Sequence, residues 1–508
     1  MSTPTPAGSR RVRVQPRRKA EAPASKAGRS GAWAIGAIVV AIVLLSVAGL
    51  RDSRGESSVD APTDTPVSSV VLSCPYFGNG DVSTSRTSIA TTAVGAKGGG
   101  GTGKSAVTKL PGNEGLDALV SSDPGAWSSD TIDSNKTGSV LLTSTGANAP
   151  GSVAFEAADA PERLGGGLAV SGCTGSAKDA WFIGAGSVAD RKSTLLLTNL
   201  SRSPAVATVS LLGTGGAVES VGGDAIVVQP GAVRAVPVED LAAGEAELGL
   251  RVQTRRGALS ASMADASTGD LQGSDWIPAS RPVAKTQTIT GLSPKARNRT
   301  LLVANPTDST ATVNLLVSGK DGVFTPRGFE QTEVRPGSIV SLDIPGSLGE
   351  EALALKLDSN EAVTATVRSV SSGSGPDVAY TAAGQALTST AVVPTRIGTA
   401  IAAEDATLVL TGSRVDSAAD ATVTAHDSSG QALDKVEVAV PAGRTIVFDP
   451  TAKGELDASA DQISYLTVDP GDVPVFATAM FRQGAKMSTV PLIAAPSTTK
   501  SPAVSAGD

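Results

Sequence analysis

The chain has 508 residues, which at roughly 100–200 residues per domain predicts three or four folding units. Hydrophobic residues make up 40% of the chain and aromatic residues only 3%, while Gly and Pro occur 56 and 30 times. This composition excludes collagen, a coiled coil and wholesale disorder, and it favours small modules packed by Val, Leu, Ile and Ala. One histidine and two cysteines exclude most metal sites and His-based catalytic centres.

The first 50 residues predict a membrane anchor. Residues 32–50 contain no charge, and a helix of that length spans about 28 Å, close to the ~30 Å hydrocarbon core. Residues 1–31 are rich in Pro, Ala and Ser and basic, so we expect a disordered tail that stays cytoplasmic by the positive-inside rule. We therefore predict a single-pass helix with residues 51–508 extracytoplasmic. The alternative is a signal peptide cleaved near Ser46-Val47-Ala48.

Charge divides unevenly at this anchor. Residues 1–50 hold eight Lys and Arg against one Glu, a net charge of +7, which leaves −14 for residues 51–508 of a chain whose net charge is −7. An acidic exported part disfavours binding of nucleic acid, or of anionic polymers over a broad face. Cys74 and Cys173 both lie on the exported side, and an even pair there predicts a disulfide, with two free thiols as the alternative.

Between a polar stalk at residues 51–70 and a polar, disordered tail at residues 496–508, the sequence repeats at about 105 residues. Three copies align on an apolar run, an Ala-Thr-Val triplet and a Pro/Gly turn. The first two copies are offset by 106, 104 and 106 residues at these three places. The runs begin at Thr194, Thr300 and Thr407, the triplets at Ala207, Ala311 and Ala421, and the turns at Pro230, Pro336 and Pro441.

Alternating apolar and polar residues predict β-strands in these copies. Residues 311–317 and 435–440 show the alternation, and Gly, Pro, Asp and Ser lie between such runs. No segment after residue 55 sustains the apolar stripe of a helix over three turns. Six to eight short strands per ~100 residues predict an all-β chain of tandem Ig-like or fibronectin-like β-sandwich modules on a single N-terminal transmembrane helix.

We predict four such modules. Residues 71–182 contain both cysteines and are expected to form a diverged β domain; the sandwich repeats follow at residues 183–278, 279–384 and 385–495. Segments that link the modules contain aromatic residues, which we expect to pack at module junctions or against the sandwich cores. A role in ligand binding is the alternative. These residues are Trp181, Trp276 and Tyr380.

A short glycine-rich motif matches a nucleotide-binding signature. Residues 98–105 satisfy GxxxxGK[ST], a pattern whose chemistry requires a buried strand before the loop and a helix after it. Pro111-Gly112 leaves room for barely one helical turn after Ser105, and no apolar strand ending in Asp supplies the second carboxylate of such a site. We therefore predict a flexible hairpin loop that binds no nucleotide at Gly98–Ser105.

No other pattern predicts a catalytic, cofactor or metal site. His426 takes the place of Leu212 and Leu316 in the other copies, so we interpret it as a strand-end or surface substitution. Calcium at module junctions would need converging oxygen ligands, and the sequence lacks the DxDxDG pattern. The alternative enzyme hypothesis, a carboxylate-based glycan hydrolase in the first module, would require nearby acids. The candidates are Glu114, Asp117, Asp123 and Asp130.

With its basic tail, anchor, cysteine pair and repeats, the chain resembles an uncharacterised actinobacterial membrane-anchored family, domain of unknown function 5719. The resemblance rests on strands similar to residues 301–306 (LLVANP) followed by a turn such as Pro336-Gly337, and it covers most of residues 30–495. It implies a cell-envelope protein and transfers no catalytic residue. We therefore expect a non-enzymatic binding or scaffolding array whose partners are envelope proteins or cell-wall glycan.

Overall fold

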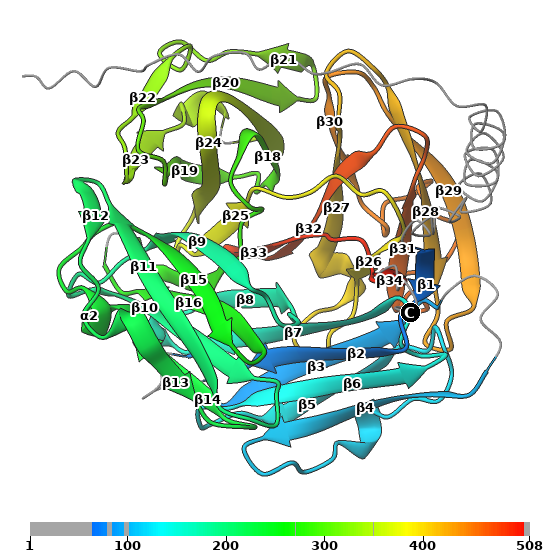
Figure 1. Ribbon diagram of the computed structural model, residues 1–508. Helices are drawn as coiled ribbons and strands as arrows, with labels where there is room; N and C mark the ends of the chain where they lie inside the picture. The colour runs from blue at the N-terminus through cyan, green and yellow to red at the C-terminus, as the bar shows by residue number, and fades with distance from the viewer. Residues whose placement is uncertain (1–62, 79–83, 96–100, 270, 349, 502–508) are drawn as a thin grey trace, which may run out of the picture. The chain divides into compact units, whose positions relative to one another are not determined.

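The computed structural model describes residues 63–78, 84–95, 101–269, 271–348 and 350–501. Residues 64–500 form one compact unit. The predicted tail and anchor, residues 1–50, lie outside the described residues, and no helix within the described ranges is long and apolar enough to span a bilayer. The described chain is nearly all β, as predicted, and α2 (Val238–Leu241) is a single helical turn (Figure 1).

Four segments of the described chain share one strand order, and we call them repeats 1 to 4. Repeat 1 contains β2 (Ser69–Pro75), β3 (Arg86–Ala93), β4 (Gly103–Leu110), β5 (Ser128–Asp133), β6 (Ser139–Gly146), β7 (Ser152–Ala160) and β8 (Gly167–Gly172). Repeat 2 contains β9 (Asp179–Ala185), β10 (Arg191–Asn199), β11 (Ala205–Gly213), β12 (Gly216–Val218), β13 (Ile226–Val228), β14 (Val233–Pro237), β15 (Leu248–Arg256), β16 (Leu259–Ser267) and β17 (Gly273–Ile277).

Repeats 3 and 4 continue the series. Repeat 3 contains β18 (Ala284–Leu292), β19 (Ala296–Asn305), β20 (Ala311–Gly319), β21 (Gly322–Phe324), β22 (Thr332–Val334), β23 (Ser338–Asp343), β24 (Leu353–Ser371) and β25 (Val378–Ala382). Repeat 4 contains β26 (Ala391–Pro394), β27 (Ala406–Gly412), β28 (Ala419–His426), β29 (Ala432–Val440), β30 (Thr445–Phe448), β31 (Tyr465–Pro470), β32 (Val475–Gln483) and β33 (Lys486–Pro491).

Seven strands are common to the repeats, and they alternate between two sheets. The first, third and fifth strands form one sheet, and the second, fourth, sixth and seventh form the other; in repeat 1 these are β2-β6-β4 and β5-β3-β7-β8. In repeat 3 the long strand β24 serves as both fifth and sixth strand, while β12, β13, β21, β22 and β29 add to the third strand of their repeats. This order differs from the ABED and CFG sheets of an immunoglobulin domain.

The two sheets of a repeat face each other across a hydrophobic core. In repeat 2, Phe182 and Leu250 from one sheet pack with Leu195 and Met263 from the other, and all four are essentially inaccessible to water. These side chains alternate with outward-facing polar residues, because successive residues of a strand point to opposite faces. The same alternation that predicted the strands therefore fixes which face of each sheet lies inside.

The seventh strands of the repeats join the repeats to one another. We call β8, β17, β25 and β33 the axial strands. Each axial strand contacts two others, in the cyclic order β8, β17, β25, β33 and back to β8. Figure 1 shows β8, β25 and β33 near the middle of the picture, on the inner sides of their repeats. The four repeats therefore form a closed cycle of contacts rather than an open string of modules.

Apolar clusters fill the junctions of this cycle. Repeats 1 and 2 meet where Phe77 packs edge-on against Trp276, with ring centroids 5.1 Å apart. Repeats 2 and 3 meet where Trp181 packs with Leu302. The cycle closes between repeats 4 and 1, where Trp127 stacks on the ring of Tyr465 at 5.2 Å. The prediction that Trp181, Trp276 and Tyr380 pack at junctions or cores is confirmed, because all three are buried there.

The recurring Pro/Gly turn lies at these junctions as well. In each repeat the turn precedes the fourth strand and approaches the third-strand hairpin of the repeat before it. The Ser318 hydroxyl of repeat 3 donates to the Gly443 carbonyl at 3.0 Å, and Arg335 of repeat 3 donates to the Thr214 carbonyl of repeat 2 at 2.9 Å. Repeat 1 contributes Pro124-Gly125, whose carbonyl accepts a hydrogen bond from Tyr465 of repeat 4 at 2.8 Å.

Two short polar strands lie where linker and tail were predicted. β1 (Thr63–Pro66) pairs with β34 (Thr498–Ser501), and the Thr65 hydroxyl donates to the Thr499 carbonyl at 3.2 Å. The predicted stalk at residues 51–70 and tail at residues 496–508 therefore contain paired strands, and β2 begins at Ser69. Backbone hydrogen bonds, rather than a buried apolar face, hold these two strands together. Their sequences therefore need no alternation of apolar and polar residues.

Closure of the cycle predicts that Gly430 tolerates no side chain. Its φ is +86°, and a Cβ atom there would overlap the Gly125 carbonyl across the junction between repeats 4 and 1. Gly430→Ala therefore combines a left-handed backbone cost of about 1–2 kcal/mol with an overpacking cost of about 1–3 kcal/mol. Thermal unfolding should show a clear fall in Tm.

Gly454→Ala is the matched control for this substitution. Gly454 has a similar φ of +90°, and nothing lies within 4 Å of an added Cβ atom. Its Tm should fall less, because it carries the backbone cost alone. Equal losses for the two variants would contradict the contact between repeats 4 and 1.

Candidate functional site

The axial strands bring a cluster of polar groups into the centre of the closed cycle. The cluster lies where these strands begin. Gly167, Gly273 and Lys486 are the first residues of β8, β17 and β33, and Asp377 directly precedes β25; the four occupy equivalent places in repeats 1 to 4. Asp377 is 1% exposed, although aspartate is among the residues least often buried. This carboxylate is the strongest candidate for a functional or structural centre in the described residues.

The Asp377 carboxylate accepts four backbone hydrogen bonds, one from each repeat. Oδ2 accepts from the N–H groups of Leu168 and Met487, each at 2.9 Å. Oδ1 accepts from the N–H of Val378 at 2.8 Å and from that of Ser274 at 3.3 Å. A carboxylate offers about four lone-pair sites, so these four donors use its full capacity and leave none for a metal ion.

Glycine at two of the other first positions permits this approach. Gly167 and Gly273 have φ angles of +132° and +139°, and a Cβ atom at either one would overlap the Asp377 carboxylate. One side chain therefore occupies a space that the equivalent residues of repeats 1 and 2 leave empty. The four repeats share a strand order but are not interchangeable at their centre.

A second carboxyl group lies two residues further along the axis. Asp275 is fully buried, and its Oδ1 accepts a hydrogen bond from the Ser488 hydroxyl at 2.7 Å. The equivalent residues of repeats 1 and 3 are Ala169 and Ala379, both fully buried and small. Asp275 on β17 and Ser488 on β33 thus form a polar pair at this level of the axis. The methyl groups of Ala169 and Ala379 occupy the equivalent positions of the other two repeats.

Burial dominates the electrostatics of both axial acids. It raises the pKa of Asp377 to about 6, although its four N–H donors act in the opposite direction. Burial also raises the pKa of Asp275 well above its ordinary value, against the hydrogen bond from Ser488, and the neighbouring Asp377 adds to the rise. The cluster therefore holds a proton more readily than exposed aspartates do.

A buried ionic network lies between repeats 2 and 3. The Arg191 guanidinium pairs with Asp265 at 3.2 Å and with Glu247 at 3.3 Å, and Glu247 also pairs with Arg368 of repeat 3 at 2.7 Å. The Tyr380 hydroxyl donates to Asp265 at 2.5 Å. Two arginines balance two carboxylates, so the network is neutral, although the Nε of Arg368 has no hydrogen-bond partner in the structure.

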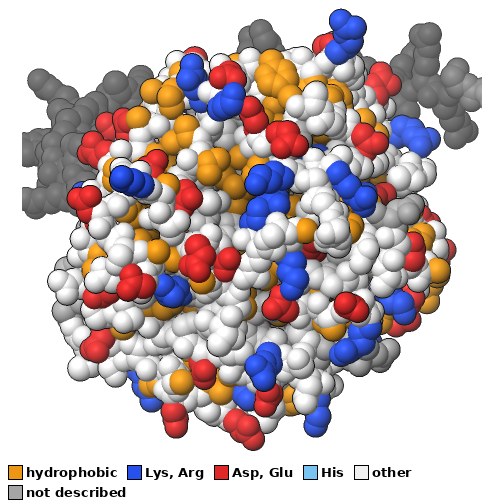
Figure 2. All heavy atoms as spheres, turned by 180° about the vertical axis from the view of Figure 1, so that it is seen from behind, with side chains coloured by type: hydrophobic (Ala, Val, Ile, Leu, Met, Phe, Trp, Pro, Cys, Tyr) orange, Lys and Arg blue, Asp and Glu red, His pale blue; other side chains and the backbone are white. Residues whose placement is uncertain are grey.

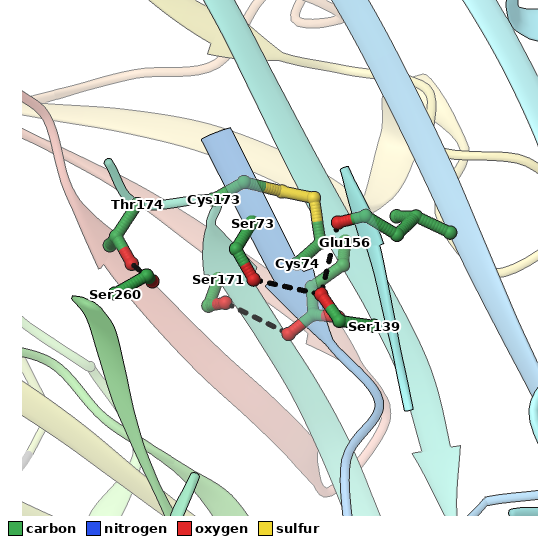
Figure 3. Close-up of a disulfide and its surroundings, with 9 residues drawn as sticks. Ser73, Cys74, Ser139, Glu156, Ser171, Cys173, Thr174 and Ser260 are labelled. Atoms are coloured by element: carbon green, nitrogen blue, oxygen red, sulfur yellow. Dashed lines mark hydrogen bonds between the residues drawn. A yellow bond between two sulfur atoms is a disulfide. The ribbon is translucent and has the colours of Figure 1, made fainter. Parts of the chain in front are cut away.

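The predicted disulfide is present in repeat 1. Cys74 on β2 and Cys173 after β8 are bonded, with their Cα atoms 4.7 Å apart, and Figure 3 shows them beside Glu156. Glu156 is buried, and its Oε1 accepts a hydrogen bond from the Ser171 hydroxyl at 3.1 Å, whereas its Oε2 has no partner in the structure. Burial raises the pKa of Glu156 well above its ordinary value, against this hydrogen bond.

Two small pockets lie on the described surface. One pocket lies between repeats 3 and 4 beside Leu316 and Val415, and another lies beside Ser187 in repeat 2. Each has a cavity volume of about 20 Å³, room for little more than one water molecule. Figure 2 shows basic and acidic side chains interspersed over the face opposite to that of Figure 1.

The described residues of the nucleotide-binding signature form neither a phosphate-binding loop nor wholly the predicted hairpin loop, because Gly103, Lys104 and Ser105 begin β4. Residues 98–100 lie outside the described residues, whereas Lys104 and Ser105 lie within β4. The Ser105 hydroxyl is hydrogen-bonded to that of Ser144 at 2.9 Å in the same sheet. The helix N-terminus that would face a phosphate is thus replaced by a strand; the absence of nucleotide binding stays a prediction.

His426 ends β28, as the strand-end interpretation predicted, but it is half-buried rather than a plain surface residue. Its ring stacks on that of Tyr465 at 4.7 Å, next to the stack of Tyr465 on Trp127 that closes the cycle. Its Nε2 lies 3.0 Å from the Thr467 hydroxyl. Burial lowers the pKa of His426, against its hydrogen bond to the Gly430 carbonyl. The substitution therefore serves the junction between repeats 4 and 1.

The four acids of the enzyme hypothesis lie on separate elements of repeat 1. Neither of the two pockets is lined by any of them, and the enzyme alternative stays a prediction. Among the described residues, no three His, Cys, Asp or Glu side chains gather as a metal site. Glu114 follows β4, Asp117 lies in a 3₁₀ turn (Asp117–Leu119), Asp123 lies in a loop and Asp130 lies on β5.

The four hydrogen bonds to the Asp377 carboxylate predict that Asp377→Asn strongly lowers the free energy of unfolding. An amide keeps one oxygen, so two of the four N–H groups would face an NH₂ group instead of an acceptor. Each buried donor without an acceptor costs about 1–3 kcal/mol, which gives a loss of about 2–6 kcal/mol in the free energy of unfolding. Denaturant unfolding at pH 8 measures this loss, and the exposed Asp308→Asn is its control. An unchanged midpoint would show that the four hydrogen bonds do not hold the repeats together.

The raised pKa of Glu156 predicts a pH dependence of stability. The folded chain keeps this proton above pH 4.5, where an ordinary Glu loses it, so the contribution of Glu156 to stability is greatest at acidic pH and falls as pH rises toward the folded pKa. Glu156→Gln removes this proton uptake. Between pH 5 and pH 8 the Tm of the variant should fall less than that of the native chain, and Glu333→Gln, on an exposed strand position, should not change the slope. A slope unaltered by Glu156→Gln would refute the assignment.

Comparison with known proteins places the chain in a family. No curated protein matches its sequence. A solved structure, the crystal structure of Thermotoga maritima 1070, matches 20% of this chain and 92% of its own with 17% identity, but the TM-score of 0.17 is too low to establish a shared fold. The profile of the Family of unknown function (DUF5719) matches residues 128–451, which is more than half of the chain. The chain therefore belongs to the DUF5719 family, as its repeats and turns suggested.

Proposed function

We propose that the chain is a membrane-anchored, extracytoplasmic and non-enzymatic protein of the cell envelope, in which the four repeats form a binding or scaffolding body. The observation that carries this proposal is the closed cycle of repeats. Packed junctions and the shared Asp377 carboxylate hold every repeat against two others. Such a body presents its outward strands in fixed positions, so that a partner meets a preorganised surface.

The sequence supports the proposed location. Residues 32–50 are long and apolar enough for an anchor, and the basic residues before them favour a cytoplasmic N-terminus. The disulfide between Cys74 and Cys173 agrees with an extracytoplasmic position, because disulfides persist in oxidising compartments. Envelope proteins and cell-wall glycan are the proposed partners.

We also propose that the repeats are β-sandwiches of the broad Ig-like or fibronectin-like kind. Support comes from the two facing sheets of each repeat and the antiparallel pairing of their strands. The alternation of consecutive strands between the sheets would then be a variant of that architecture, since sandwich proteins share layers more often than strand order.

Purification of the full-length chain from membranes tests this function. The chain should resist carbonate extraction, and after detergent solubilisation it should retain a stable protein partner or glycan. Mass spectrometry and sugar analysis of the purified material identify what is retained. If neither is retained, the binding or scaffolding function is refuted; if the material hydrolyses envelope glycan, the enzyme alternative replaces it.

A variant without the anchor provides the control. Val40→Arg with Val43→Arg places two charges at the centre of residues 32–50, each costing about 2.5–3.5 kcal/mol on insertion. This variant should appear in the carbonate-soluble fraction or fail to reach the membrane. If it stays membrane-bound to the same extent as the native chain, residues 32–50 are not the anchor.

A further inference from the structure

Basic side chains gather at one end of repeat 2, although the exported chain is acidic. All of them are exposed, and within the described residues none takes part in an ion pair. We call this group the basic end. It consists of Lys178, Arg202, Arg234, Arg255 and Arg256.

Strand pairing brings the basic end together from distant parts of the sequence. The Thr254 N–H donates to the Lys178 carbonyl at 3.0 Å, which sets Lys178 beside the end of β15. Arg256 lies opposite Val206 on β11, and Val206 lies opposite Val227 on β13.

The remaining members lie beside these strands. Arg234 donates to the Val227 carbonyl at 3.0 Å, so it adjoins the row formed by β15, β11 and β13. The loop that carries Arg202 approaches Gly257, because Ser201 lies next to the position that a Gly257 side chain would occupy. The basic end therefore covers the ends of neighbouring strands on one side of repeat 2.

Neighbouring side chains orient some of this charge. Arg255 donates to the Thr208 hydroxyl at 3.2 Å and to the Gln253 amide oxygen at 3.1 Å. Two acids lie close by: Asp179, which is already paired with Arg251 at 2.6 Å, and Asp224, whose carbonyl accepts from Thr208. Positive charge therefore remains in excess, with polar groups beside it that can hydrogen-bond to hydroxyl groups.

The corresponding positions of the other repeats carry the opposite charge. Arg202 follows the Asn199 turn as Asp308 follows the Asn305 turn in repeat 3, and Asp416 lies in the same loop of repeat 4. At the end of the fifth strand, repeat 3 has Asn360-Glu361 and repeat 4 has Gly471-Asp472 where repeat 2 has Arg255-Arg256. The positive charge is thus a property of repeat 2 and not a requirement of the fold.

We propose that the basic end of repeat 2 binds an anionic polysaccharide, that is, a polymer of sugars that carry phosphate, sulfate or carboxylate groups. This proposal rests on the proposed binding function and names the chemical class of its partner. Exposed strand ends without a deep pocket suit an extended polymer better than a small ligand. A membrane surface would favour a broad apolar face beside the charges, and Val227, 41% exposed, is a small one. The net charge of −14 on residues 51–508 limits such binding to this end of repeat 2.

Binding of dextran sulfate to the full-length chain in detergent tests this proposal, with neutral dextran of the same length as the comparison. Dextran sulfate should bind, neutral dextran should not, and the logarithm of the affinity should fall linearly with the logarithm of the salt concentration. The variant Arg202→Asp, Arg255→Asn, Arg256→Glu gives repeat 2 the residues of repeat 3. It should bind about tenfold more weakly or worse while keeping its Tm.

The matched control changes net charge by the same amount elsewhere. Lys285→Glu, Arg327→Asn and Arg414→Asp are substitutions of exposed residues in repeats 3 and 4, and this variant should bind dextran sulfate as the native chain does. Equal losses in the two variants would show that total charge, not the basic end, governs binding.

Two further outcomes overturn the proposal. Binding of phosphatidylglycerol vesicles without binding of dextran sulfate would assign the basic end to a lipid surface. Failure to bind either probe would remove the basic end as a binding site. Retention of a protein partner by the charge-reversed variant would, in that case, leave the proposed scaffolding function intact and refute only the polysaccharide.

Discussion

The closed cycle depends on one carboxylate that serves four repeats. Asp377 accepts one backbone N–H near the start of each axial strand, groups that would otherwise be buried without partners. A hydroxyl or an amide offers fewer acceptor sites, and a carboxylate is compact enough to lie between four backbones. Because the donors belong to separate repeats, this one side chain ties their relative positions together, while the apolar junctions supply most of the buried area.

That constraint also explains why repeats with one strand order differ in sequence at their centre. Four aspartates at the equivalent positions would place four buried carboxylates together, which the low dielectric of an interior strongly disfavours. The chain has glycine in repeats 1 and 2, and in repeat 4 it has Lys486, which pairs with Asp159 at the surface. In a single chain of fused repeats, one repeat can therefore have aspartate at this position while the others have a different residue. An assembly of identical subunits could not, since symmetry would place the same residue in every copy.

Particular elements show how far the sequence predicts this structure. Alternation and the recurring apolar runs predicted β10, β19 and β27, and the Pro/Gly turns were recognised as turns. Their place at the junctions was not predictable, because a turn signal describes local backbone and not the neighbour it meets. Asp377 was missed for the same reason: its partners are backbone N–H groups, which every residue but proline possesses. The one sequence signal was its alignment with Gly167 and Gly273.

Closure separates the residues that hold the body together from those available for recognition. The junctions and cores bury the side chains of Trp181, Trp276 and Tyr380. The few aromatic residues of the described chain therefore serve mainly to pack the repeats together. The proposed binding function then depends on outward strands and loops, where side chains vary without cost to the core. The contrast between Arg256 and Glu361 at corresponding strand ends is a difference of this kind. On the surface of this repeated fold, outward charge distinguishes repeat 2 from repeats 3 and 4, and the proposed binding function places recognition there.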